Sequence, residues 1–133
     1  MVTRLSVPTE SREQLIDMTE HVQKVLRDSG VQAGVVTVFV PHTTAAVTIN
    51  ENADPSVCAD LLKALDELVP RSASYYRHVE GNSDAHVKAT LVGSSAQVLA
   101  ENGELVLGTW QGIYFCEFDG PRSRKLWIKI AAD

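Results

Sequence analysis

From residue 87 to residue 118 the chain reads VKATLVGSSAQVLAENGELVLGTWQGIYFCEF. Its β-branched and aromatic residues occur in short runs separated by turn residues, a pattern typical of consecutive strands. We predict strands over residues 87–92, 97–99, 105–107 and 109–118. Asn102-Gly103 stands between the second and third of these, and this dipeptide is the strongest short signal for a two-residue hairpin. The second half of the chain is therefore predicted to form an antiparallel sheet.

The predicted sheet continues on both sides of this segment. Residues 35–40 read VVTVFV, an apolar run typical of a central strand that is covered on both faces. Residues 45–50 (AAVTIN) form the next strand, and a short strand over residues 2–7 opens the chain. Residues 125–130 (KLWIKI) alternate in polarity, as expected of a strand with one face in the core.

Two helices are predicted to pack on this sheet. The first is capped by Thr9 or Ser11 and ended by Gly30, because apolar residues recur three and four positions apart between them. Its apolar stripe consists of Leu15, Met18, Val22, Val25 and Leu26. The second begins at Asp54-Pro55, a suitable N-cap and first helical residue, and ends before Pro70. The predicted fold class is α+β, a curled, mostly antiparallel or mixed sheet of about seven strands with two helices.

Length and composition restrict the classes of protein. A chain of 133 residues falls within the range of one domain, so residues 1–133 are predicted to form a single domain. The net charge of −5 leaves no surplus of Lys and Arg for a nucleic-acid partner. No apolar run approaches the roughly 20 residues that a membrane helix needs. Cys58 and Cys116 lack CxxC spacing and residues 1–4 begin no apolar export signal, so we expect a reduced, cytoplasmic protein.

The segment from His78 to His86 reads HVEGNSDAH and combines two imidazoles, two carboxylates and an amide around a glycine. Imidazole and carboxylate groups suit borderline divalent metals such as zinc. A loop bent at the glycine either brings the histidines together at a site or remains an ordinary solvated loop, and the spacing leaves both open. His42 lies between two predicted strands, where a functional role and a turn-stabilising role are both open.

Several motifs in the same order make the chain similar to the YjbQ family, also called UPF0047, over nearly its whole length. The matching segments are Pro41–Ala45, Asn50–Pro55, Tyr76–Gly81, Asp84–Lys88, Leu91–Ser95, Gly108–Gln111 and Glu117–Arg122. The resemblance implies a compact α+β domain that assembles as a homotrimer. It also implies a weak thiamine-phosphate synthase activity, which joins a pyrimidinylmethyl diphosphate to a thiazole phosphate.

The resemblance further implies roles for individual residues. His42, His78 and His86 would form a cluster able to hold a divalent metal, zinc or magnesium, with an open coordination position. The remaining implied site residues are Glu51 as a general acid or base or as a partner that orients a ligand, Lys88, Ser94, Ser95 and Arg122 as donors to phosphate oxygens, and Trp110 and Gln111 as the pocket floor. For Trp110, a place in the core or at a subunit interface is an equal alternative.

Three functions follow from these residues. The first is the synthase, in which the histidines, Lys88 and the other basic groups stabilise a departing diphosphate. The second is a metal-dependent hydrolase, in which Glu51 takes the proton of a metal-bound water. The third is a non-enzymatic trimer that binds a small anionic ligand or a partner protein. All three expect the three histidines to share one cavity beside basic groups.

Overall fold

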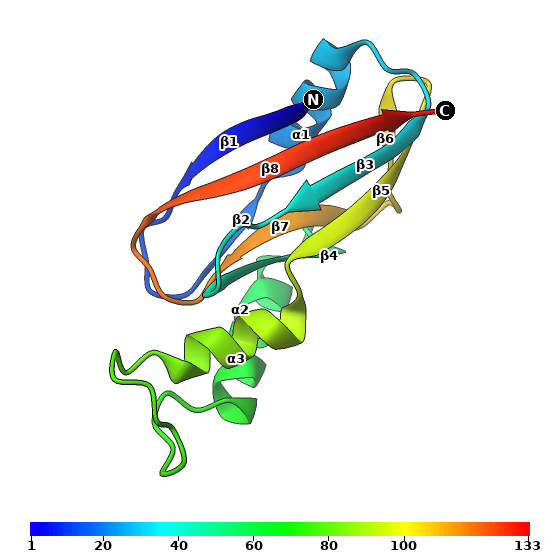
Figure 1. Cartoon of the computed structure of the whole chain (residues 1–133). Coiled ribbons are helices and arrows are strands. Elements are labelled where there is room, and N and C mark those ends of the chain that lie inside the picture. The colour runs from blue at the N-terminus through cyan, green and yellow to red at the C-terminus, as the bar shows by residue number, and fades with distance from the viewer.

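The computed structural model describes all 133 residues and contains eight strands and three helices (Figure 1). In chain order these are β1 (Val2–Pro8), β2 (Gln14–Asp17), α1 (Thr19–Ser29), β3 (Gly34–Phe39), β4 (Ala45–Glu51), α2 (Pro55–Leu68), α3 (Ser83–Val92), β5 (Ser95–Glu101), β6 (Glu104–Val106), β7 (Gln111–Glu117) and β8 (Ser123–Ala132). The predicted α+β class is confirmed, and β2 and α3 are the two elements that the sequence patterns did not predict.

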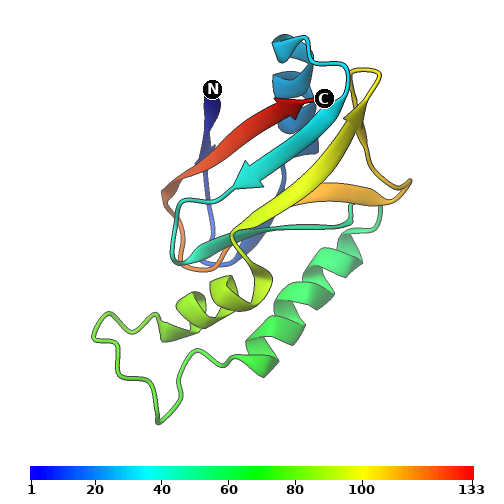
Figure 2. The ribbon, with the colours of Figure 1, turned by 45° about the vertical axis from the view of Figure 1, so that its right-hand side comes forward.

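The strands form two antiparallel sheets rather than one. The larger sheet has the order β1-β8-β3-β5-β6, and the smaller has the order β2-β7-β4. Figures 1 and 2 show α2 and α3 together beyond the smaller sheet, whereas α1 lies near the two chain termini. No helix is of the length and apolar character needed to cross a lipid bilayer.

The core fills the space between the two sheets. Val36 and Val38 of β3 and Leu126 of β8 meet Phe115 of β7, and Leu26 of α1 completes the cluster. A second, smaller cluster on the far face of the smaller sheet joins Ala46, Cys116 and Phe118 to Ala85 and Ala89 of α3. The smaller sheet is therefore covered on both faces, which explains why β7 is buried along almost its whole length instead of alternating.

The hairpin predicted at Asn102-Gly103 is confirmed. It joins β5 to β6, and Glu101 pairs with Glu104 across the turn. Asn102 has a φ of 54° and Gly103 a φ of 73°, and a two-residue turn with positive φ at both positions matches the twist of the flanking strands.

The predicted start of the first helix is wrong. Leu15 belongs to β2, which pairs with the edge of β7, and α1 begins only at Thr19. The N-cap of α1 is Met18, which makes no side-chain capping hydrogen bond, and the preceding Asp17 carboxylate accepts from the Thr19 backbone N–H at 2.9 Å and from the Thr19 hydroxyl at 2.6 Å. The predicted start of the second helix is confirmed, since Asp54 accepts from the Ser56 N–H at 2.9 Å.

The strand predicted over residues 87–92 is also wrong, because these residues form most of α3. The helix puts Ala85 and Ala89, four residues apart, on the face that packs against the smaller sheet. It also buries Lys88 among carboxylates, as described below. These tertiary contacts outweigh the β propensity of the segment.

Candidate functional site

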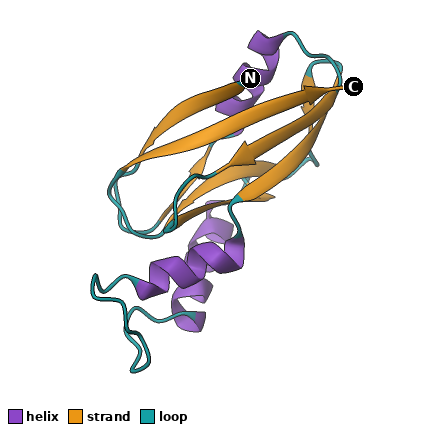
Figure 3. Ribbon diagram, viewed as in Figure 1, coloured by secondary structure: helices purple, strands orange, loops and turns teal.

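A cavity of about 720 Å³ opens at one end of the two sheets. At this end β3 and β7 finish and β4, β5 and β8 begin, so the β3–β4, α3–β5 and β7–β8 connections border the cavity. The loop before α3 and the second turn of α3 complete the wall. Figure 3 shows this loop, between α2 and α3, extending away from the sheets.

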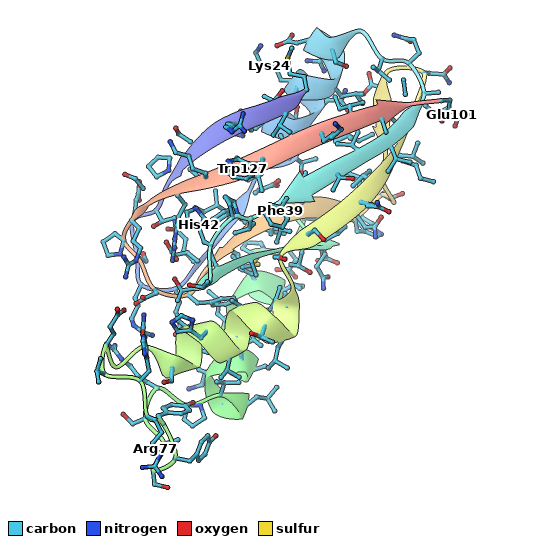
Figure 4. The ribbon with its side chains drawn as sticks, in the orientation of Figure 1. Lys24, Phe39, His42, Arg77, Glu101 and Trp127 are labelled. Atoms are coloured by element: carbon cyan, nitrogen blue, oxygen red, sulfur yellow. The ribbon has the colours of Figure 1, made fainter.

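The cavity brings together five of the residues expected at a site. They are His42, His78, His86, Ser94 and Arg122. His42 lies in the connection that leaves β3, whereas Arg77 lies at the outer tip of the loop before α3 (Figure 4). His86 is on α3 rather than in a loop, and its ring stands perpendicular to that of His78 with 5.2 Å between the ring centroids. The His78 Nε2 also lies 3.7 Å from the Glu80 carboxylate.

His42 is held in one tautomer by a backbone group. Its Nε2 accepts a hydrogen bond from the Lys125 N–H at 2.9 Å, so the neutral ring carries its proton on Nδ1. Burial lowers the pKa of His42, and the positive charges of Arg124 and Arg122 lower it further. The ring is therefore neutral near pH 7 and its Nδ1–H is a hydrogen-bond donor.

Arg124 is a buried guanidinium in the cavity wall. Its Nε donates to the Glu117 carboxylate at 2.9 Å, and its Nη2 donates to Glu117 and, at 2.8 Å, to the Thr44 hydroxyl. Burial alone raises the pKa of Glu117, but the hydrogen bonds from Arg124 and Thr9 outweigh it and lower that pKa. Nη1 makes no hydrogen bond within the chain, so its N–H groups are available to a bound molecule.

Arg122, Asp119 and Asn82 form a second polar group in the same wall. The Arg122 Nε donates to the Asp119 carbonyl oxygen at 2.8 Å and its Nη2 donates to Asp119 Oδ2 at 3.0 Å. The Asn82 Nδ2 donates to the same Oδ2 at 2.7 Å. Although burial raises the pKa of Asp119, these two side-chain hydrogen bonds bring it below its ordinary value. The Arg122 Nη1 also remains without a partner in the chain.

Lys88 does not line the cavity. Its side chain is 1% exposed and its Nζ lies 2.9 Å from Glu13, 2.5 Å from Asp66 and 3.9 Å from Asp84. Arg12 completes the network through two hydrogen bonds to Asp84, at 3.1 and 3.2 Å. Lys88 thus fixes α3 against α2 and the segment before β2, and its buried Nζ lies outside the cavity wall, so it is not placed to bind a phosphate there.

Glu51, Trp110 and Gln111 lie together at the opposite end of the smaller sheet. Glu51 pairs with Gln111 across β4 and β7, and the Asn52 N–H donates to the Trp110 carbonyl oxygen at 2.9 Å. Because β4 extends from Ala45 near the cavity to Glu51, this group is roughly 20 Å away at about 3.3 Å per residue. Ser95, paired with Phe39, is exposed beside the cavity but does not line it.

Sequence reasoning did not single out Asn82, Asp119 or Arg124 as site residues. For Arg124, however, one signal was present in the sequence. Arg124 precedes Leu126 and Ile128 at the spacing that turns all three toward the core, so a charge stands at an inward position of an alternating strand. A buried charge requires a partner, and Glu117, the last residue of the preceding buried strand, supplies the carboxylate.

Fold and cavity together define a class, namely α+β domains of two antiparallel sheets with a histidine- and arginine-lined cavity at one end. Within it, the chain belongs to the family described as UPF0047 protein YjbQ-like, whose model matches residues 3–133.

Several relatives support this assignment. The chain is 50% identical over 130 residues to the UPF0047 protein YugU of Bacillus subtilis, covering 98% of each chain. It is 47% identical over 133 residues to a UPF0047 protein of Methanocaldococcus jannaschii, covering 100% of this chain and 96% of the relative.

Solved structures agree with the fold. The crystal structure of an uncharacterized YjbQ/UPF0047 protein from Clostridium acetobutylicum superposes with a TM-score of 0.95 at 56% identity, covering 97% of this chain and 99% of that one. A YbjQ-like protein of unknown function from Sulfolobus solfataricus gives a TM-score of 0.94 at 33% identity, covering 100% and 97%.

Proposed function

We propose that the cavity binds a small phosphorylated molecule and joins a pyrimidinylmethyl diphosphate to a thiazole phosphate, giving thiamine phosphate and diphosphate. The observation that carries the proposal is the pair of arginines, Arg122 and Arg124, which both line the cavity and each have an Nη1 that makes no hydrogen bond within the chain. Guanidinium N–H groups match the geometry of phosphate oxygens.

The orientation of these donors is already fixed before a ligand binds. Arg124 is held by Glu117 and Thr44, and Arg122 is held by Asp119, through their other nitrogens. The His42 Nδ1–H and the Ser94 hydroxyl add neutral donors to the same wall. Donors that need no rearrangement stabilise developing negative charge more effectively than mobile ones.

The reaction places a modest demand on the protein. The bond between the pyrimidinylmethyl carbon and the diphosphate oxygen breaks, the electron pair leaves with diphosphate, and the thiazole nitrogen supplies the pair for the new C–N bond. No proton is removed in this step, so the distance of Glu51 from the cavity does not count against it. The chain's contribution is to hold both phosphorylated groups and to offset the charge that accumulates on the departing one.

The donor chemistry does not fit a metal held by His42, His78 and His86. The Nε2 lone pair of His42 is engaged by the Lys125 N–H and its Nδ1 carries the proton, so no ring nitrogen is left for an ion. No group of three or more His, Cys, Asp or Glu side chains is placed to surround an ion. A hydrolase that relies on Glu51 is disfavoured for a further reason, since Glu51 is at the other end of β4.

Arg122→Gln is expected to weaken the binding of inorganic diphosphate about tenfold, because one charge-assisted contact is lost from a partly exposed site. Isothermal titration calorimetry measures the binding, and a labelled-substrate assay measures thiamine-phosphate formation, which should fall in Arg122→Gln and in His86→Ala. Arg27→Gln is the matched control, since Arg27 is an exposed arginine in the last turn of α1.

The outcomes separate the candidate functions. Unchanged diphosphate affinity in Arg122→Gln refutes the cavity as the anion site. Tight diphosphate binding without any thiamine phosphate formed refutes the synthase and favours a non-enzymatic binder of anions.

We also propose that the chain assembles as a homotrimer, as the resemblance implies. Support comes from apolar side chains that the single chain leaves uncovered, including Leu99 and Val106 on the larger sheet and Leu68 and Leu91 on the helices. Light scattering should give a mass three times the chain mass of 14.5 kDa. A mass of one chain at micromolar concentration would exclude the trimer.

A further inference from the structure

Asn82 is the N-cap residue of α3, but its side chain makes no capping hydrogen bond. An asparagine in this position usually accepts a hydrogen bond from a backbone N–H two or three residues further on. The Asn82 side chain makes no such bond and is only 7% exposed. Instead its Nδ2 donates to Asp119 Oδ2 at 2.7 Å, which fixes the orientation of the amide because a carboxylate oxygen only accepts.

This orientation leaves the Asn82 carbonyl oxygen without a partner. Oδ1 is buried and accepts no hydrogen bond from the chain, and Asn82 is part of the cavity wall. Buried polar side-chain atoms without partners are few in native proteins, and each calls for an explanation. The other one in this chain, the indole nitrogen of Trp127, belongs to a residue that is not part of the cavity wall.

We infer that Asn82 determines specificity, by accepting a hydrogen bond from an N–H or O–H group that the ligand carries in addition to its anionic group. The inference rests on the proposed anion site and names a second requirement of the same ligand. The two arginines retain any phosphate, whereas the Asn82 oxygen rejects a phosphate compound that has no donor at this point.

The two requirements belong to side chains that share one partner. Asp119 Oδ2 accepts from both Asn82 and Arg122, so the unpartnered Asn82 oxygen and the unpartnered Arg122 Nη1 belong to two groups that contact a single carboxylate. The Oδ1 of Asp119 also makes no hydrogen bond in the chain and can accept from the same ligand group. A donor two or three bonds from a phosphate ester is therefore expected to reach Asn82 while the phosphate contacts Arg122.

Three small phosphate esters test the inference by calorimetry at one pH and one ionic strength. Propyl phosphate has no donor, 2-hydroxyethyl phosphate has a neutral O–H, and 2-aminoethyl phosphate has a charged N–H group of similar size. We expect the unmodified protein to bind each donor-bearing ester at least roughly tenfold more tightly than propyl phosphate. If only 2-aminoethyl phosphate binds more tightly than propyl phosphate, the site accepts from N–H donors. If both donor-bearing esters bind more tightly to the same extent, the site accepts from N–H and O–H donors alike.

Two variants separate the amide oxygen from the anion site. In Asn82→Ala the ratio between 2-hydroxyethyl and propyl phosphate should fall to about one. In Arg122→Gln both affinities should fall together and the ratio should persist. Thermal unfolding verifies that each variant is folded, and the ratio measured in the unmodified protein does not depend on either variant.

Failure of this inference is distinguishable from failure of the anion site. If the unmodified protein binds propyl phosphate as tightly as it binds both donor-bearing esters, or if folded Asn82→Ala keeps the preference, Asn82 does not determine specificity and the anion site still stands. If the unmodified protein binds none of the three esters, the anion site fails and the inference about Asn82 fails with it.

Discussion

Lys88→Met is expected to lower the free energy of unfolding by about 3–5 kcal/mol. Methionine keeps most of the volume of the side chain but removes the charge that Glu13 and Asp84 face in a nearly water-free position. Glu13 and Asp84 would then share Arg12 as their remaining cationic partner, and Asp66 would lose its ion pair with Lys88. Urea denaturation measures the effect as a lower midpoint with an unchanged slope.

Lys24→Met provides the matched control. Lys24 pairs with Asp28 four residues away, the same sequence separation as Lys88 and Asp84, but both side chains are exposed. An exposed pair of this kind contributes at most about 0.5 kcal/mol. A loss of less than 1 kcal/mol in Lys88→Met, together with weaker diphosphate binding, would show that Lys88 serves the ligand after all and that its burial is not structural.

Glu117→Gln is expected to cost a similar amount, about 3–5 kcal/mol, because it leaves the Arg124 guanidinium buried beside a neutral side chain. Glu117 accepts hydrogen bonds from Thr9 at 2.7 Å and from two nitrogens of Arg124. In glutamine an NH₂ donor would replace one of these acceptor oxygens and would face the donors of Thr9 and Arg124. The pair is 0% and 5% exposed, so water cannot replace the lost acceptor.

Glu67→Gln is the control for this change, because Glu67 faces Lys63 at 3.9 Å with both side chains over 70% exposed. Chemical denaturation should show almost no shift for it. If Glu117→Gln were equally harmless, Arg124 would not depend on Glu117 for its position, and the argument for a fixed donor in the cavity wall would fail.

Sequence patterns predicted most strands because the local signals and the tertiary contacts agree there. The apolar run of β3 agrees with its position in the sheet, between β5 and β8. At Asn102-Gly103 the turn chemistry alone determines the hairpin. The pattern failed at α3, where Val87 and Leu91 suggest a strand but remain partly exposed on the helix. Nothing local reveals that Lys88 is paired with Glu13, 75 residues earlier in the chain.

The candidate site was predictable where chemistry is concentrated in the sequence. His42, His78 and His86 stood out as imidazoles at strand ends or in a polar segment, and the fold places them around one cavity. Other expected residues lie away from the cavity. Glu51 and Gln111 are at the far end of β4 and β7, which was not predictable because the spacing of residues in the sequence does not show in which direction a strand runs. Asn82 was visible in the sequence only as the amide of the His78–His86 segment, and the structure shows that its oxygen has no partner in the chain.

A crystal structure of the protein with inorganic diphosphate tests the anion-binding cavity most directly. Our account predicts diphosphate in the cavity, with oxygens at 2.7–3.0 Å, roughly, from the Nη1 atoms of Arg122 and Arg124. Diphosphate bound only elsewhere on the protein, with this cavity holding water at saturating concentration, would contradict it.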